Sequence, residues 1–180
     1  TSFASGLPLA LSAGTLQAWY TESGADLMTI GLLSLVGLPY LFKVCWAPLL
    51  DRYIPFALGK RKSWLVISQA LMAITLLFMA QLNPLMQPKM MALLALLLAF
   101  FSASQDIVVD AYRTEISKED ERGIAASYLA VGYRLAMVVS GALTLIIADY
   151  FGWKITYSLM AVLMLLLMLV SWFIPKVPHN

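Results

Sequence analysis

Residues 100–113 read FFSASQDIVVDAYR and decide how the rest of the chain is interpreted. They close a run from Met90 to Phe101 that contains only apolar residues, which is typical of a membrane helix. Asp106 and Asp110 stand four residues apart in the last third of this predicted helix, so they share one of its faces. A carboxylate inside a membrane helix is costly, and by default it faces the bundle interior and serves a function.

The composition indicates a protein whose solvent is the bilayer. Of its 180 residues, 61% are hydrophobic and 12% are charged, and the mean hydropathy is +0.82. A soluble domain carries about 25% charged residues. We therefore predict an all-α membrane protein with six transmembrane helices in one domain, residues 1–180. The six segments, each near the ~20 residues that cross a bilayer, are 1–20, 29–50, 63–81, 89–112, 123–148 and 154–174.

Basic residues are unevenly distributed between the predicted connections. Connections 2–3 and 4–5 and the C-terminal tail hold eight Lys and Arg, whereas the other connections hold Lys89 and Lys154. Cytoplasmic loops carry the excess of Lys and Arg, so both chain ends are expected in the cytoplasm. The eight residues are Arg52, Lys60, Arg61, Lys62, Arg113, Lys118, Arg122 and Lys176.

Several classes of function are excluded by what the chain lacks. It has one cysteine, Cys45, which we expect to be buried, and one histidine, His179 in the polar tail. An internal disulfide, a thiolate metal site and histidine catalysis are therefore not expected. No Gly-rich phosphate loop or nucleophile–base pair is present. We therefore do not expect an enzyme, and we expect no cofactor, no metal ion and no nucleic-acid partner.

Two positively charged residues and one negatively charged residue are expected at a similar depth in the membrane. Arg134 lies about midway along the fifth predicted helix, and Lys43 and Asp106 lie within about two turns of their helix centres. A water-filled cavity lined by these residues is one interpretation, because charges facing lipid cost about 2.5 to 3.5 kcal/mol or more each. A buried salt bridge between Asp106 and Lys43 or Arg134, holding helices together, is the other.

Each of these charges has a functional hypothesis. Asp106 is a candidate proton-coupling carboxylate, since burial disfavours its charged form whereas a nearby cation favours that form. Arg134 suits a bidentate clamp on a substrate carboxylate or phosphate. Lys43 supplies a second positive point, or its long stem snorkels toward the cytoplasm. Asp110 and Arg113 are expected to pair at the helix end.

Uncharged residues complete the candidate site. Gln105 is costly to bury unpaired and either contacts substrate or, like Ser102 and Ser104, hydrogen-bonds within or between helices. Tyr40 and Tyr133 lie near the basic residues and are suited to stacking on a sugar ring. Trp19, Tyr20, Trp46, Tyr112, Trp153 and Trp172 lie near helix ends, where an interfacial aromatic belt is expected.

The connection between the second and third helices resembles a known loop motif. It reads Trp46-Ala-Pro-Leu-Leu-Asp51-Arg52-Tyr53 and then Gly59-Lys60-Arg61-Lys62. This is similar to the loop motif of the major facilitator superfamily, in which an Asp-Arg pair precedes a glycine and a basic cluster. The extra residues Tyr53 to Leu58, and Ala47 where a glycine is usual, depart from the common form. The stretched form resembles the AmpG-type muropeptide permease branch.

Further motifs along the chain support the same branch. The Gln-Asp-Ile signature at 105–107 is also similar to acetyl-CoA transporters, but there Asp-Gly-Trp is expected where this chain has Asp110-Ala111-Tyr112. The matches to the muropeptide branch are Phe3-Ala-Ser-Gly-Leu-Pro-Leu-Ala-Leu11, Gly14-Thr-Leu-Gln-Ala-Trp19, Ser102-Ala-Ser-Gln-Asp-Ile-Val108, Asp110-Ala111, Glu121-Arg-Gly123, Gly132-Tyr-Arg134 and Ser140-Gly141.

The resemblance implies one six-helix half of a transporter, built from 3+3 inverted repeats, with a C-terminal six-helix half absent. The implied activity is proton-driven import of anhydromuropeptides (GlcNAc-anhydroMurNAc peptides) across the bacterial inner membrane for peptidoglycan recycling, which also feeds β-lactamase induction. Transport of another anionic metabolite such as acetyl-CoA, or a nontransporting membrane scaffold derived from a truncated transporter, are the alternatives.

For such a substrate, position and chemistry give hypotheses for the roles of individual residues. The peptide carboxylates would meet Arg134 and Lys43, and the co-transported proton would meet Asp106. In the loop motif, Asp51 would accept hydrogen bonds from a helix N-terminus of the other half. Arg52 and the basic cluster, with Gly59 and Arg61, would contact acids or lipid headgroups and latch the cytoplasmic side.

Overall fold

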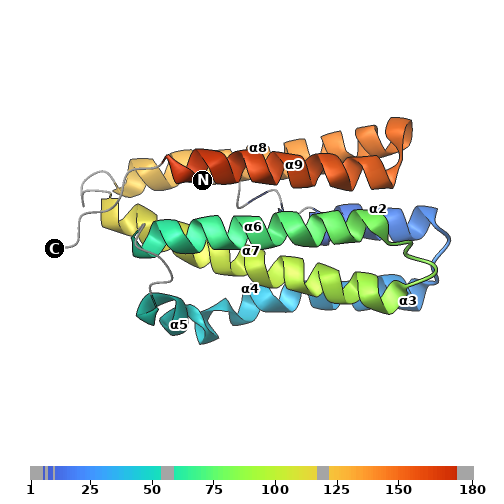
Figure 1. Cartoon of the computed structure of the whole chain (residues 1–180), viewed down its shortest axis with the longest axis horizontal. Helices are drawn as coiled ribbons and strands as arrows, with labels where there is room; N and C mark the ends of the chain where they lie inside the picture. Colours follow the sequence, from blue (N-terminus) through green and yellow to red (C-terminus); the bar gives the residue numbers. More distant parts are fainter. Residues whose placement is uncertain (1–5, 7, 10, 54–58, 117–121, 174–180) are drawn as a thin grey trace.

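The computed structural model describes residues 6, 8–9, 11–53, 59–116 and 122–173, and throughout these ranges the regular structure is helical. The long helices run side by side along the longest axis of the molecule (Figure 1). The elements are α2 (Gly14–Glu22), α3 (Leu27–Leu32), the 3-10 helix η1 (Leu33–Gly37), α4 (Leu38–Phe42), the 3-10 helix η2 (Lys43–Cys45), α5 (Ala47–Arg52), α6 (Lys60–Gln81), α7 (Pro88–Ile116), α8 (Arg122–Phe151) and α9 (Trp153–Trp172).

Five stretches of the described chain are long and apolar enough to cross a membrane: Leu27–Cys45, Arg61–Gln81, Pro88–Glu115, Ala126–Phe151 and Trp153–Trp172. The predicted all-helical membrane class is therefore confirmed. The first predicted segment, residues 1–20, lies partly outside the described residues, and its described end is helical from Gly14. The expectation of a sixth spanning helix stays a prediction.

The second spanning segment is broken into short pieces. Pro39 and Pro48 lie in the first turns of α4 and α5, and neither has an N–H group to continue the helical hydrogen bonds before it. The 3-10 pieces η1 and η2 lie between the α-helical ones. The expectation that Cys45 is buried was wrong, because its side chain is exposed on this segment. An apolar thiol is no better accommodated inside such a bundle than against lipid tails, which are equally apolar.

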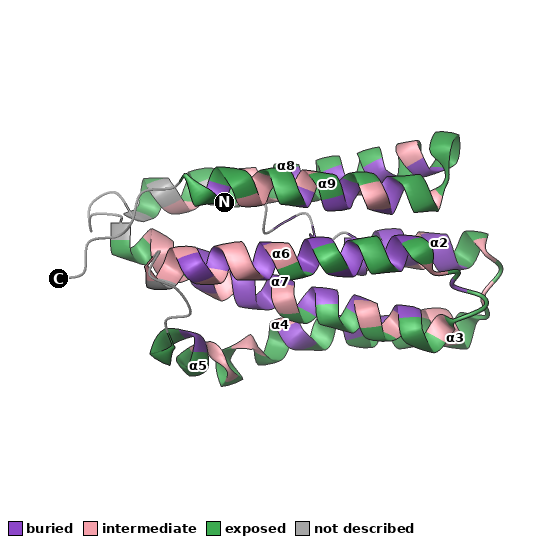
Figure 2. Cartoon of the chain, viewed as in Figure 1, coloured by how far each residue is buried: buried purple, intermediate pink, exposed green. Residues whose placement is uncertain are grey.

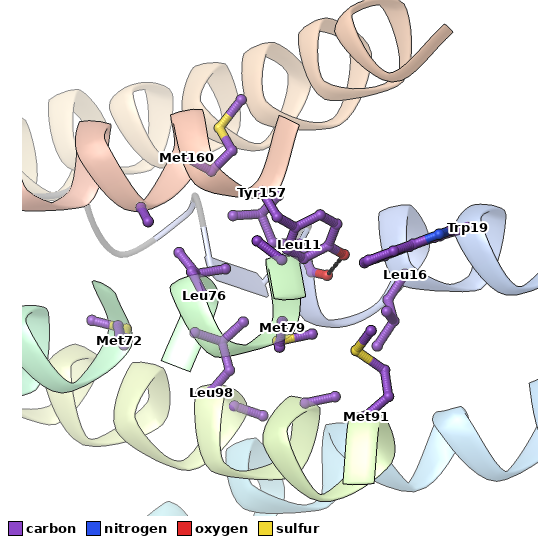
Figure 3. Packing of buried hydrophobic residues seen from close by; sticks show 14 of the residues in the cluster. Leu11, Leu16, Trp19, Met72, Leu76, Met79, Met91, Leu98, Tyr157 and Met160 are labelled. Carbon is purple, nitrogen blue, oxygen red and sulfur yellow. Dashed lines mark hydrogen bonds between the residues drawn. The ribbon is translucent and has the colours of Figure 1, made fainter. Parts of the chain in front are cut away.

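The core of the bundle centres on α6, which packs most extensively against α9 and α7. Buried residues are dense on α6 and α7, whereas α8 is largely exposed (Figure 2). Figure 3 shows Tyr157 of α9 reaching Leu11, whose carbonyl oxygen accepts a hydrogen bond of 2.9 Å from the tyrosine hydroxyl. Trp19 and Tyr20 also belong to this core. They were predicted in an interfacial belt near helix ends, and the structure buries their side chains inside the bundle instead of leaving them on its surface.

The start of the chain makes a close approach to α8 at Gly6. A Cβ atom added to Gly6 would lie 2.7 Å from the carbonyl oxygen of Tyr133 and 3.0 Å from Cβ of Ala136. Real Cβ atoms essentially never come within 3.0 Å of another heavy atom, so the contact requires glycine. This approach fixes the position of the described N-terminal residues against the part of α8 that carries Tyr133.

Candidate functional site

Polar side chains from three elements gather around Tyr40. The Tyr40 hydroxyl lies beside Ser102 of α7 and Ser12, and it interacts electrostatically with Asp106 and Tyr133. Tyr133 of α8 in turn interacts electrostatically with Asp106 and Asp110. The structure therefore brings together three residues predicted for the site: Tyr40, Asp106 and Tyr133. We call Tyr40, Ser12, Ser102, Asp106 and Tyr133 the Tyr40 cluster.

The cluster lies at the part of α7 that the sequence singled out. Ser102 and Gln105 are fully buried, Asp106 is half-buried, and the Oδ1 atom of Asp106 is itself buried. Positions 102 and 106 are four apart and share a face of α7. A membrane helix with this many buried polar atoms turns that face toward protein, because exposure to lipid costs several kcal/mol per unsatisfied group.

Ser104 holds the second spanning segment against α7. Its hydroxyl donates a 2.8 Å hydrogen bond to the carbonyl oxygen of Phe100 and accepts one of 3.1 Å from Nε1 of Trp46. The Trp46 ring also packs on Phe100, with ring centroids 4.8 Å apart. The expectation that Ser104 bonds within its helix or to a neighbour is confirmed. Trp46, expected only in an interfacial belt, helps to hold Tyr40 near α7.

The two predicted cationic residues stand apart from these contacts. Lys43 is half-buried in η2, three residues after Tyr40, and Arg134 is exposed on α8. Successive residues of an α-helix are about 100° apart, so Arg134 cannot point in the same direction as Tyr133. The Tyr133 side faces the cluster, whereas the Arg134 side chain is open to whatever covers α8. Its predicted role as a substrate clamp stays a prediction.

The loop motif forms a network of charges at one end of the bundle. Arg61 at the start of α6 donates hydrogen bonds of 2.9 and 2.6 Å to Oε1 of Glu115, near the end of α7, and a further one to Oδ1 of Asp51 in α5. Glu115 was missed by the sequence analysis, because no local pattern marks which helix end meets a given arginine. Arg52 is exposed at the end of α5.

Gly59 sets the geometry of this network. Its φ of +97° lies in a region that side chains with a Cβ rarely adopt, so glycine is needed where the chain enters α6. Nε1 of Trp64, in the first turns of α6, donates a 2.9 Å hydrogen bond to the carbonyl oxygen of Tyr53. Residues 54–58, the stretched part of the motif, lie outside the described residues.

Within α7, Asp110 and Arg113 form the predicted ion pair, with Oδ1 of Asp110 and Nη2 of Arg113 3.7 Å apart.

Aromatic residues tie the helices together at the opposite end. The rings of Trp19 and Trp153 stack with centroids 5.7 Å apart, and Nε1 of Trp153 donates a 2.6 Å hydrogen bond to Glu22. The Tyr20 hydroxyl donates to the carbonyl oxygen of Pro88 at the start of α7.

Among the residues described, no group of three His, Cys, Asp or Glu side chains is arranged to hold a metal ion.

Apolar helices long enough to span a membrane, an internal polar cluster and a charged loop network at one end are typical of a membrane transport protein of the helical-bundle class. Comparison with known families places it further: the chain matches the model of the Major Facilitator Superfamily over residues 1–180, and it belongs to that family. Because the family consists of transporters, the expectation that the chain is not an enzyme is confirmed.

Individual relatives agree with the resemblance seen in the motifs. The chain is 49% identical over 175 residues to the anhydromuropeptide permease of Escherichia coli K12, covering 97% of this chain and 36% of that protein. An uncharacterized protein of Haemophilus influenzae is 41% identical, with 99% and 42% covered, and the putative transporter AmpG 4 of Rickettsia conorii is 37% identical, with 88% and 40% covered. The chain thus spans about two-fifths or less of each of these relatives.

Proposed function

We propose that the complete protein imports anhydromuropeptides across the bacterial inner membrane, together with protons, for peptidoglycan recycling. The observation that carries the proposal is the 49% identity to the anhydromuropeptide permease of Escherichia coli along 97% of this chain. The Tyr40 cluster supports it, because an internal carboxylate that interacts electrostatically with Tyr40 and Tyr133 suits a proton-coupled carrier of a polar ligand. The unevenly distributed basic residues support an orientation with the Arg61 end in the cytoplasm.

In this proposal the substrate lies between this six-helix domain and a second six-helix half, each built from 3+3 inverted repeats. Arg134 is exposed on α8 and available to a ligand or partner that covers this helix. Its guanidinium group binds a peptide carboxylate through two parallel hydrogen bonds, which a lysine cannot do. Lys43 adds a second positive charge for the several carboxylates of a muropeptide stem. Gln105 and Tyr133 contribute uncharged contacts.

Asp106 carries the coupled proton. Its position in α7 beside the hydroxyl groups of Tyr40 and Tyr133 supports this role, because such groups stabilise whichever protonation state the bound ligand selects. A proton that crosses a potential of about 100 mV supplies about 2.3 kcal/mol. That free energy supports a substrate gradient of roughly 50-fold, which is sufficient to retrieve a dilute periplasmic ligand.

The charge network at Arg61 serves the conformational cycle. Arg61 links α5, α6 and α7 through Asp51 and Glu115, so these ends move as one unit. In the proposed cycle Asp51 also meets a helix N-terminus of the other half when the cytoplasmic side closes. Arg52 and the basic residues around Arg61 contact acidic groups or anionic headgroups at the same membrane surface.

The proposal is tested by ligand binding to the purified complete protein. Labelled anhydromuropeptide should bind to the wild type, and Arg134→Ala should weaken binding by at least about 30-fold, since truncating one partner of a hydrogen-bonded charge pair costs about 2–5 kcal/mol. Lys154→Ala is the matched control, because Lys154 is also an exposed cation but lies in the first turn of α9, at an end of the bundle and not in the middle of a helix. A wild-type protein that is well folded and binds no anhydromuropeptide contradicts the proposal.

A further inference from the structure

Ser102, like Thr144, differs from many serine and threonine residues of the described helices, because its buried hydroxyl oxygen has no hydrogen-bond partner among the described residues. The usual arrangement is a hydrogen bond from the hydroxyl group to the carbonyl oxygen four residues earlier. Two residues along the same helix, Ser104 makes this bond to Phe100. The residues that follow the usual pattern are Thr21, Ser63, Ser68, Thr75, Ser104, Ser127, Thr156 and Ser158.

A second buried hydroxyl group lies beside it. The Tyr40 oxygen is also buried without a hydrogen-bond partner among the described residues, although it adjoins Ser102 and Ser12. Ser12 donates its own hydrogen to the carbonyl oxygen of Leu9 at 3.2 Å. Two buried hydroxyl groups from different elements, α4 and α7, therefore lie at one place, and neither makes a hydrogen bond of ordinary length and angle with a described residue. Buried polar groups are almost always hydrogen-bonded, so a third group is expected to satisfy them.

The chemistry of that third group follows from its surroundings. Each hydroxyl group donates one hydrogen bond and accepts others, so a group that both donates and accepts satisfies Tyr40 and Ser102 together. The carboxylate of Asp106 is close by, and it disfavours an anionic group at the same point. The uncharged part of a ligand fits this position, and its carboxylates belong nearer Lys43 and Arg134.

We propose that Tyr40 and Ser102 form a subsite that binds an uncharged hydroxyl or acetamide group of the sugar part of the transported ligand. Tyr40 acts through its hydroxyl group here, and not through its ring face as the sequence analysis expected. The inference rests on the proposed function, since it assigns one part of a sugar-peptide substrate to one place in the bundle. Ser102 becomes a binding residue that determines specificity for the sugar.

The test is competition binding with the purified complete protein. Labelled anhydromuropeptide is displaced by the peptide-free disaccharide and, separately, by the sugar-free peptide. Tyr40→Phe keeps the ring and Ser102→Ala keeps the helix, and each should weaken disaccharide binding about 3- to 10-fold, the value of one neutral hydrogen bond. Binding of the free peptide should not change. Ser68→Ala is the matched control, because the Ser68 hydroxyl bonds only to carbonyl groups of its own helix.

The outcomes separate the two proposals. Weaker disaccharide binding by Tyr40→Phe and Ser102→Ala, with unchanged peptide binding, supports the subsite. Disaccharide binding by both variants equal to that of the wild type overturns the subsite and leaves the proposed function standing. An equal loss for disaccharide and peptide also overturns it, since the effect is then not specific to the sugar. A wild type that binds no anhydromuropeptide refutes the proposed function, and the subsite falls with it.

Discussion

Arg61 is joined to Glu115 by two hydrogen bonds, of 2.9 Å from Nε and 2.6 Å from Nη2, although 54 residues separate them. The same guanidinium group also donates to Asp51. One side chain therefore fastens the ends of α5, α6 and α7 to each other. Only 12% of the Arg61 side chain is exposed, so the pair is better shielded from solvent than an ordinary surface ion pair.

Lysine cannot replace Arg61 in this network. A guanidinium group presents its donors in a rigid fork, whereas an ammonium group is a single point of charge. In a double-mutant cycle of Arg61→Lys and Glu115→Gln, we expect a coupling of about 1 kcal/mol in the free energy of unfolding, near the upper end for partly exposed pairs. The coupling should fall as salt is added.

The Asp110–Arg113 pair is the control for that cycle. Its distance is 3.7 Å and both side chains are more exposed than Arg61, so its coupling should be close to zero. Equal couplings for the two pairs would show that the fork at Arg61 adds nothing.

The contact at Gly6 predicts an unusual difference between two glycines. Gly6→Ala brings Cβ against the backbone oxygen of Tyr133, and the helices must separate at a cost of about 1–3 kcal/mol. Gly14→Ala meets nothing within 4 Å and should be neutral or slightly stabilising. Thermal unfolding of both variants in detergent checks this, and equal melting temperatures would contradict the close approach of the chain start to α8.

Asp26 predicts a small pH dependence of stability below about pH 4. Side-chain and backbone hydrogen bonds from Thr29 lower the pKa of Asp26 below its ordinary value of 3.8, and the backbone bond measures 2.9 Å. Because the folded-state pKa is below the unfolded one, the stabilisation is present above the unfolded pKa and is lost as the pH falls through the folded pKa.

Asp26→Asn keeps a side-chain oxygen to cap α3 but cannot titrate in this range. The melting temperature of the wild type should fall relative to this variant as the pH decreases below about 4. Parallel curves for the two proteins across that range would show that Asp26 makes no pH-dependent contribution.

Asp106→Asn should separate coupling from binding. Asparagine has nearly the same shape as aspartate and hydrogen-bonds to its neighbours, but it cannot take up the transported proton. We expect the variant to lose net accumulation of substrate while exchange of labelled for unlabelled substrate continues at a rate within a few-fold of the wild type. Accumulation that still follows the pH gradient in the variant would remove Asp106 from the coupling role.

The helical class and much of the Tyr40 cluster were readable from the sequence because the costs involved are local. A long apolar run must be helical in a bilayer, and a carboxylate such as Asp106 must turn inward. The breaks of the second segment follow from Pro39 and Pro48 in the same way.

Other features depend on which helices meet and at what register. The pairing of Arg61 with Glu115 and the unsatisfied hydroxyl of Ser102 appear only when helices distant in sequence are placed together. Trp19 has the position of an interfacial residue along its helix, yet α9 covers it through Trp153 and Tyr157. Local pattern gives depth in the membrane, but not which side chains lie opposite.

The most direct test of the central claim is uptake of labelled anhydromuropeptide by cells that lack their own permease and express the complete protein, with and without a proton uncoupler. We expect accumulation that collapses when the uncoupler is added, and no accumulation in cells with the empty vector. The absence of uptake by a protein shown to be inserted in the membrane would refute anhydromuropeptide import and favour another anionic metabolite as the substrate.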